Sequence, residues 1–166
     1  MVVSEKEILD SLQQIVGSEN VIKISYPMGS LNQNRYKGSW NPIFCYTTMG
    51  NLSFFYKLIT TATEKYKYAS GDIGFLILSL NHGATFYFEP SFYRDPNDGE
   101  ESQSVEKLFL EVSSRLIQEG AFFDRLYPMW AKKVYARASY YHSKVKGIKK
   151  VVDPKNIMNP GKLAFE

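Results

Sequence analysis

Apolar positions near the start of the chain recur at the spacing of one helical face. They are Ile8, Leu9, Leu12, Ile15 and Val16. A repeat of three to four residues is typical of an amphipathic helix. Ser4 followed by Glu7 forms a capping-box pattern, and Gly17 is a residue type that ends helices. We therefore expect a helix over residues 4–16, and "NVIKISY" after it predicts a short strand that ends at Tyr26.

A regular alternation of elements follows a loop that is rich in Gly, Ser and Asn at residues 27–41. "PIFCYTT" is apolar, β-branched or aromatic and predicts a strand. "NLSFFYKLITTATEKYKY" predicts a helix with Asn51 as its N-cap. Its apolar face consists of Leu52, Phe55, Ile59 and Ala62. Two apolar strands, "DIGFLILSLN" and "GATFYFEPSFY", then meet at a tight turn of Asn81, His82 and Gly83.

The last elements of this region are a polar loop, a helix and a short strand. "DPNDGEESQS" predicts the loop, "SVEKLFLEVSSRLIQEG" an amphipathic helix ended by Gly120, and "AFFDR" the strand. The order β-α-β-β-α-β is that of the split βαβ, ferredoxin-like arrangement. The pattern therefore predicts an α+β fold, a ferredoxin-like sheet with helices on one face. Its units are an N-terminal helix and strand over 1–26, a cap-type domain over 41–126, and a C-terminal extension over 127–166.

The C-terminal extension is predicted to be a helix followed by a tail that contains several turn-forming residues. Pro128 suits the first turn of a helix, and the apolar pattern continues from Trp130 to Val151. Pro154 ends it, because proline has no N–H and disfavours the α region for the residue before it. The tail "VVDPKNIMNPGKLAFE" then contains three clusters of turn-forming residues. An ordinary helix stop with a disordered end is the alternative interpretation.

Composition narrows the class of protein. The chain has 166 residues, which fits one domain or one domain with an extension. It contains neither an apolar run long enough to span a membrane nor a signal-peptide pattern. Cys45 is the only cysteine, so the default expectation is a reducing, cytoplasmic setting. No cluster of Cys and His has the spacing of a metal site, and we expect none.

Basic residues gather near the end of the chain, and within 131–162 only Asp153 opposes them. Such a basic segment suits nucleic acid, an anionic cofactor or an acidic partner, and a solvated helix face is the plainer explanation. The aromatic RNP1 pattern of RNA-binding sheets is absent, so we do not expect nucleic acid as a partner.

The tail resembles the C-terminus of FAD-linked oxidases related to vanillyl-alcohol oxidase, p-cresol methylhydroxylase and the D-lactate/glycolate dehydrogenases. These chains close with a D-P-x-x-I-x-N-P-G-K pattern. Its fixed positions here are Asp153, Pro154, Ile157, Asn159, Pro160, Gly161 and Lys162. The resemblance extends more loosely back to about Asn41. It implies that the region before the tail is a substrate cap and that Asn159, Gly161 and Lys162 lie at the cofactor-binding side.

The family's FAD-binding domain has no counterpart here. Its Gly-rich segment, whose backbone holds a pyrophosphate, is missing from this sequence. The resemblance therefore implies FAD as cofactor only together with a flavin-binding partner chain, and a small organic substrate. The alternative is a non-catalytic interaction module, such as a homodimer, that has lost the flavin domain.

Three side chains are candidates for the substrate site. Arg125, in "FFDRLYP", stands where the vanillyl-alcohol-oxidase branch carries Tyr and Arg near the flavin, and it would clamp an anion. Tyr127 would donate a phenolic hydrogen bond, and His82 would face flavin or substrate as a base. A surface pair of Asp124 with Arg125 and a solvent-facing His82 are the alternatives. "DRLYPMW" replaces the E-H-G pattern of the hydroxy-acid branch, which argues against metal-assisted chemistry.

The remaining polar or reactive residues have structural interpretations. We expect His142 at the surface, Cys45 as a buried small hydrophobe, and the acids of "NDGEES" as solvated loop residues. We expect Tyr135, Tyr140 and Tyr141 to pack through their rings and to keep their hydroxyl groups in contact with water.

Overall fold

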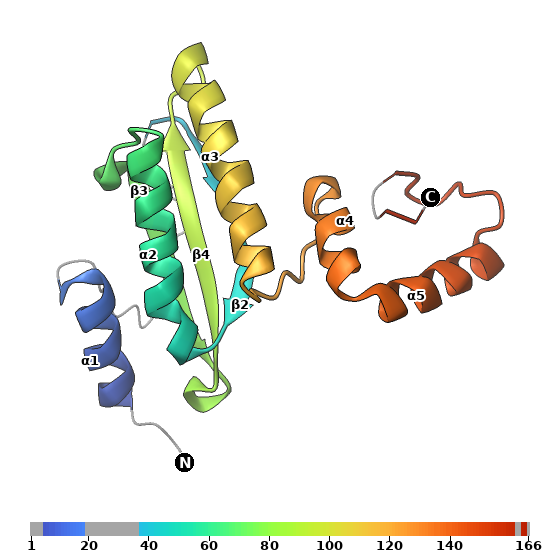
Figure 1. Ribbon diagram of the computed structural model, residues 1–166, viewed down its shortest axis with the longest axis horizontal. Coiled ribbons are helices and arrows are strands. Elements are labelled where there is room, and N and C mark those ends of the chain that lie inside the picture. The colour runs from blue at the N-terminus through green and yellow to red at the C-terminus, as the bar shows by residue number, and fades with distance from the viewer. Residues whose placement is uncertain (1–4, 19–36, 162–163, 166) are drawn as a thin grey trace.

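The computed structural model describes residues 5–18, 37–161 and 164–165 (Figure 1). The helices are α1 (Glu5–Val16), α2 (Met49–Lys65), α3 (Gly99–Gln118), α4 (Pro128–Arg137) and α5 (Ser139–Val152). Two short 3-10 turns, η3 (Ser70–Asp72) and η4 (Asn81–Gly83), flank one strand. The predicted Ser4 cap and the predicted strand at 21–26 lie outside the described residues.

Four strands form one antiparallel sheet around a central strand. They are β1 (Ser39–Pro42), β2 (Cys45–Thr47), β3 (Ile73–Leu80) and β4 (Thr85–Arg94). β4 pairs with β1 and β2 along one edge and with β3 along the other. Because α2 connects β2 to β3 while β4 lies between them, the β-α-β connection is split as the pattern predicts. The α+β class is confirmed.

The ends of the predicted sheet differ from the expectation. The final strand predicted at 121–125 is reduced to one bridge between Tyr46 and Phe122. The loop predicted over 27–41 is wrong for its last residues, because β1 begins at Ser39. Ser39 pairs with Arg94, the last residue of β4. This polar stretch is therefore a strand because β4 lies beside it, which its composition does not indicate.

Pro90 explains why β1 and β2 are separate strands although they lie end to end along β4. The strand predicted over 42–48 contains all of β2 but only Pro42 of β1. β1 and β2 share one register along β4, and between them the Ile43 N–H donates to the Pro90 carbonyl at 2.9 Å. Proline has no N–H to return to Ile43, so the ladder is interrupted there. A proline in a central strand is unusual, and here its consequence is limited to this gap.

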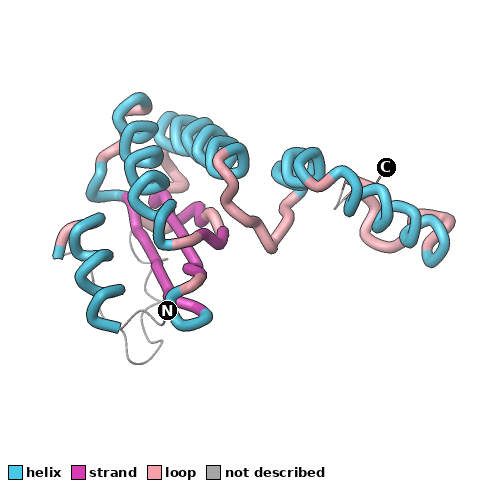
Figure 2. The backbone as a smooth tube through the Cα atoms, turned by 60° about the horizontal axis from the view of Figure 1, so that its bottom comes forward, coloured by secondary structure: helices cyan, strands magenta, loops and turns pink. Residues whose placement is uncertain are grey.

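α2 and α3 cover one face of the sheet (Figures 1 and 2). The alternate residues Phe86, Phe88 and Phe92 of β4 point into this core and are buried. Phe88 lies 6.3 Å from Phe55 of α2, ring centre to ring centre, and 6.0 Å from Phe75 of β3. Aromatic pairs at this separation add to the burial of apolar area that drives folding.

Two helices begin elsewhere than predicted. α3 starts at Gly99, inside the predicted polar loop, because the Asp98 side chain accepts the Glu101 N–H at 2.9 Å and caps it. α2 starts at Met49 with Thr48 as N-cap, so the prediction of Asn51 as the cap is wrong. Asn51 instead donates its N–H to the Thr48 carbonyl within the first turn.

Trp130 packs the C-terminal extension against the core. Trp130 of α4 is only 1% exposed, and its ring lies 4.9 Å from that of Phe123 and 5.7 Å from that of Phe109. The predicted continuous helix is interrupted at Ala138, whose φ of −121° and ψ of 47° lie outside the helical region. α5 then extends away from the sheet and buries no residue (Figure 1).

Candidate functional site

The face of the sheet opposite α2 and α3 contains a group of polar and aromatic side chains. The register of β4 places Tyr87, Glu89, Ser91 and Tyr93 on this face, since they alternate with the core phenylalanines. Tyr46 of β2 lies directly opposite Tyr87, and their rings meet edge to face at 5.6 Å. We call this surface the polar sheet face, and Glu89 and Ser91 within it are buried.

A buried carboxylate lies on the polar sheet face. Glu89 is 5% exposed, and the Tyr87 hydroxyl donates to its Oε2 at 2.5 Å. The Ser91 hydroxyl lies 3.4 Å from Oε1. Burial and the hydrogen bond to Glu89 raise the pKa of Tyr87 above its ordinary value. The pair therefore combines a neutral phenol with a carboxylate that depends on it for a hydrogen bond.

A second tyrosine–carboxylate pair and a cation lie at the rim of this face. The Tyr46 hydroxyl donates to Asp124 Oδ2 at 3.2 Å, and desolvation and Asp124 raise the pKa of Tyr46. The Arg125 guanidinium lies 4.8 Å from the ring centre of Phe44. Its positive charge acts against the raised pKa of both Tyr46 and Tyr87, which places Arg125 within electrostatic reach of both phenols.

Two of the three predicted substrate-site residues come together. Tyr127 lies next to Phe44, with ring centres 6.5 Å apart, so Arg125 and Tyr127 flank the same aromatic side chain. Asp124 bonds Tyr46, and no ion pair links it to Arg125, although both residues are within the described ranges. The surface-pair alternative therefore does not describe how Arg125 is held.

His82 lies apart from that pair. It occupies the η4 turn between β3 and β4 with a φ of 56°, and its side chain is exposed. Among the contacts of the described residues, none connects it to Arg125 or Tyr127. The solvent-facing alternative therefore fits its position in this chain.

Sequence reasoning missed Tyr46, Tyr87 and Glu89. The signal was present in "TFYFEPS", where a glutamate follows a tyrosine by two residues inside an apolar strand. Two-residue spacing puts both on one face, and an acid there needs a hydrogen-bond donor.

The tail folds around one carboxylate. Asp153 is 5% exposed, and it accepts the Ile157 N–H at 2.9 Å and the Met158 N–H at 3.0 Å. Lys149, one turn earlier in α5, donates to Asp153 Oδ2 and, at 2.6 Å, to the Met158 carbonyl. The hydrogen bond from Lys149 and those from the two amides lower the pKa of Asp153, against a smaller rise from desolvation. The turn-forming tail is thus an ordered structure held by Asp153.

The far end of the tail returns to the helices. The His142 ring stacks on Tyr135 at 4.4 Å and lies 5.7 Å from Phe165, and its Nε2 lies 2.8 Å from the Ala164 carbonyl. The expectation of a free surface position for His142 is therefore wrong, because the returning tail covers it. Tyr135 is buried, as a packing residue should be, whereas Tyr140 and Tyr141 are exposed, and the Lys144 ammonium lies 5.2 Å from the ring centre of Tyr140.

The tail alone offers no enclosure for FAD. Asn159 and Gly161 have positive φ values of 48° and 71°, and both are exposed. Neither lines the pockets found within the described residues, and Lys162 lies outside those residues. A cofactor of that size would need a second surface beside this one.

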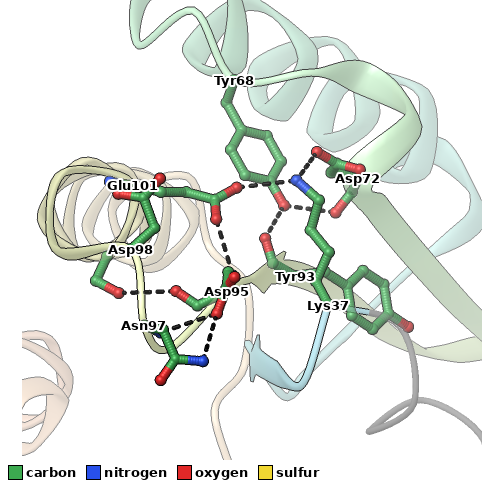
Figure 3. Close-up of polar contacts among 9 residues, drawn as sticks. Lys37, Tyr68, Asp72, Tyr93, Asp95, Asn97, Asp98 and Glu101 are labelled. Atoms are coloured by element: carbon green, nitrogen blue, oxygen red, sulfur yellow. Dashed lines mark hydrogen bonds and ion pairs between the residues drawn. The ribbon is translucent and has the colours of Figure 1, made fainter.

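A third group of polar residues connects the start of α3 to the sheet (Figure 3). The Lys37 ammonium donates to Asp72 at 2.5 Å and to Glu101 at 2.9 Å. The Tyr68 hydroxyl donates to the carbonyls of Asp72 and Tyr93. The prediction that the acids of "NDGEES" are solvated loop residues holds only in part. Asp98 and Glu100 are exposed, but Asp98 caps α3 and Glu101 is ion-paired with Lys37. In this group the charged and polar side chains are hydrogen-bonded to one another or to the backbone, which indicates a structural role.

The reactivity of Cys45 is suppressed by its surroundings. Its Sγ lies 3.3 Å from the Phe88 carbonyl, and burial, with a further contribution from Asp124, raises its pKa to about 12. The prediction of a buried small hydrophobe is confirmed.

The described residues contain no group of three metal-ligating side chains, and within them no helix is long and apolar enough to cross a bilayer. No curated protein and no solved structure matches the chain significantly. Residues 142–163 match the family model of FAD linked oxidases, C-terminal domain. The match spans most of α5 and the Asp153-centred tail, so this closing segment is similar to the C-terminal segment of those oxidases.

Proposed function

We propose that the chain is the substrate-cap and C-terminal module of an FAD-linked oxidoreductase and that it works only with a flavin-binding partner chain. The observation that carries this proposal is the family match over 142–163. All the fixed positions of the tail pattern lie inside that span, and the first of them, Asp153, organises the fold of the segment.

An exposed apolar surface supports the need for a partner. Tyr141, Val145, Ile148 and Val152 recur at helical spacing along α5, and Ile148 is 62% exposed. The neighbouring tail adds Ile157 and Met158, which are also exposed. We call these residues the α5 surface. Exposed apolar side chains gathered on one surface are typical of a protein–protein contact.

The charges around the α5 surface favour an acidic partner. Lys144 and Lys150 lie on α5, and Asp153, the one acid in the sequence between residues 131 and 162, is paired with Lys149. Two copies that packed α5 against α5 would bring these like charges together, which is unfavourable. A flavin-binding chain with an apolar groove and an acidic rim fits better.

The polar sheet face, with its exposed rim around Arg125, is the surface we assign to the substrate. In the proposed complex flavin accepts the hydride, and the residues of this chain position the substrate. Arg125 would bind a carboxylate or phenolate group, since a guanidinium presents paired donors to planar anions. Tyr46, Tyr87 and Tyr127 would add phenolic donors.

The test is whether the chain captures a flavin-binding partner. The purified chain alone should show no flavin absorbance after incubation with FAD and desalting. The full chain used as bait should retain a partner whose absorbance spectrum contains the flavin band, and organic substrate should bleach that band. Retention of FAD by the isolated chain, or a captured partner without flavin, would contradict the proposal.

A non-catalytic interaction module is the second candidate, and the exposure of the α5 surface favours it equally. Sedimentation velocity distinguishes the homodimer form of this candidate. A concentration-dependent dimer that is abolished by a charge on the α5 surface would support it, and a monomer at high concentration would exclude it.

A further inference from the structure

α4 is fixed to the body of the protein, whereas α5 is not. Trp130 of α4 is buried in the core, and Arg137, the last residue of α4, donates to the Gln118 carbonyl at the end of α3. α5 buries no residue and runs away from the sheet at an angle to α4 (Figures 1 and 2). The direction of α5 therefore depends on its junction with α4 at Ala138.

The local sequence favours a straight helix through this junction. Ala138 has a φ of −121° and a ψ of 47°, which lie outside the helical region, although alanine is the strongest helix former. Residues 129–146 contain neither proline nor glycine, the residue types that most often bend a helix. The cause of the bend therefore lies in contacts that reach the junction from elsewhere in the chain.

One ring stack distinguishes the bent form from a straight helix. The rings of Tyr135 in α4 and His142 in α5 are nearly parallel, with their centres 4.4 Å apart. Residues seven positions apart on a straight helix are separated by about 10.5 Å along its axis, at 1.5 Å per residue. Helical side chains all lean toward the N-terminus, so their rings keep that separation. The stack is therefore a contact that only the bent form makes.

The end of the tail holds this stack together. The Phe165 ring lies 5.6 Å from that of Tyr135 and 5.7 Å from that of His142, and the Ala164 carbonyl accepts from His142 Nε2 at 2.8 Å. We call Ala164 and Phe165 the tail tip. A cleft of about 350 Å³ remains beside the same rings, so the two helices are not close-packed there. Because the tail tip contacts one ring from each helix, it favours the bend.

A straight helix would gain contacts of its own. The first N–H groups of a helix have no acceptor inside it, and α5 begins without a side-chain cap, because its N-cap is Ala138. In one continuous helix these N–H groups would bond the carbonyls of the last turn of α4. Each arrangement thus has contacts that the other lacks, which is the property of a two-state element.

We propose that the junction of α4 and α5 has two states, a bent one held by the tail tip and a straight one in which α4 and α5 form a single helix. Release of the tail tip turns α5, and with it the α5 surface, relative to the sheet. The two states follow from contacts within this chain. Only their use, to present the α5 surface to a flavin-binding partner, rests on the proposed function.

Two measurements on the full chain follow the junction. The carbon chemical shift of the Ala138 Cα reports whether this residue is helical. Spin labels on Lys107→Cys in α3 and Lys150→Cys in α5, both exposed positions, report the direction of α5 through the distance between them. Cys45 is buried, so the labels react with the introduced cysteines. In the wild type we expect a non-helical Ala138 and one principal distance.

Phe165→Ala removes both ring contacts of the tail tip. The ratio of straight to bent chains should rise about tenfold or more, which appears as a helical shift at Ala138 and a second label distance. Adding Ala138→Gly disfavours the straight helix and should reduce that ratio again about fivefold. A Phe165 that only fastened the tail would not respond to a change at residue 138. Phe54→Ala, on α2, removes another partly exposed phenylalanine and should behave like the wild type.

Two results would overturn the proposal. One is an unchanged Ala138 shift and label distance in Phe165→Ala, and the other is a second distance that Ala138→Gly leaves as populated as before. If Phe165→Ala fails to fold, His142→Leu breaks the same contacts from the α5 side and decides in its place. Failure to capture a flavin-binding partner would contradict the proposed function and leave the two states untouched.

Discussion

Lys149 and Asp153 are one helical turn apart, and together they attach the tail to α5. Asp153 receives the Lys149 ammonium and two tail amides, and Lys149 also bonds the Met158 carbonyl. The ion pair thus satisfies backbone groups that a helix end and an irregular segment would otherwise leave without partners. It is a structural reason for an aspartate just before the proline that ends the helix.

Replacement of Asp153 by alanine should release the tail without unfolding the sheet. The Ile157 and Met158 amides lose their acceptors, so their hydrogen exchange should accelerate strongly, while amides in β4 exchange as before. Asp10→Ala, an exposed change on α1, is the control and should leave the tail amides protected. Unchanged protection in Asp153→Ala would show that something else orders the tail.

The same carboxylate gives the tail a pH dependence with a definite sign. The pKa of Asp153 is lowered from its ordinary 3.8 in the folded chain, chiefly by Lys149. Its contribution is therefore complete above pH 3.8 and is lost as pH falls below that value through the lowered pKa. Exchange of the Met158 amide, corrected for intrinsic rates and followed downward from pH 5, should accelerate only below that point. A transition near neutral pH would contradict this account of Asp153.

Loss of the Tyr87 hydroxyl should destabilise the fold through Glu89. Tyr87→Phe leaves a buried carboxylate with only the longer contact to Ser91, and we expect a loss of about 1–3 kcal/mol in the free energy of unfolding. Urea denaturation measures it. Tyr46→Phe is the matched variant, and its loss should be smaller, because Asp124 is exposed and water replaces the phenol. Equal losses would contradict this account of Glu89.

Arg125→Gln separates folding from substrate binding. Arg125 is exposed and contacts Phe44 through its guanidinium, so the unfolding free energy should fall by no more than about 1 kcal/mol. In the reconstituted flavin complex the KM for an anionic substrate should rise about tenfold or more. Arg115→Gln, on the exposed side of α3, should change neither quantity. A wild-type KM in Arg125→Gln would remove this residue from the substrate site.

Charge placed on the α5 surface should block partner binding. Ile148→Glu introduces a carboxylate into an exposed apolar stripe, and affinity for the captured partner should fall about fivefold or more. Ser143→Glu makes the same charge change on a different face of α5 and should retain the partner. Surface plasmon resonance compares the two, and equal affinities would exclude the stripe as the contact.

Cys45 should be nearly inert in the folded chain. Because burial raises its pKa from 9.0 to about 12, the thiolate fraction at pH 8 falls about 1,000-fold. Alkylation by iodoacetamide should therefore be very slow until denaturant is added. The raised pKa also means that the contribution of Cys45 to stability is present below pH 9 and is lost as pH rises above that value. Rapid alkylation of native protein would show that the β2 region opens readily.

The order of elements was predictable because each carries its own periodic signal. Phe86, Phe88 and Phe92 alternate at two residues, and Leu52, Phe55, Ile59 and Ala62 recur on a helical face. These patterns identified β4 and α2. The start of α3 was missed although Asp98 and Glu101 form a capping pattern, since the acidic run read as a loop. The break between β1 and β2 depends on Pro90, a residue some 47 positions away that only pairing brings opposite Ile43.

The candidate site divides in the same way. By itself, the sequence determined the α+β order of helices and strands, the buried thiol, the family pattern of the tail, and Arg125 and Tyr127 as candidates. Tertiary structure alone decided that Arg125 lies within electrostatic reach of Tyr46 and Tyr87, that Tyr46 bonds Asp124, and that Thr47 lines a pocket at the start of α2. The physical reason is distance along the chain. Periodicity and capping act over a few residues, whereas these contacts join segments that only the pairing of β2, β4 and the 121–125 segment brings together.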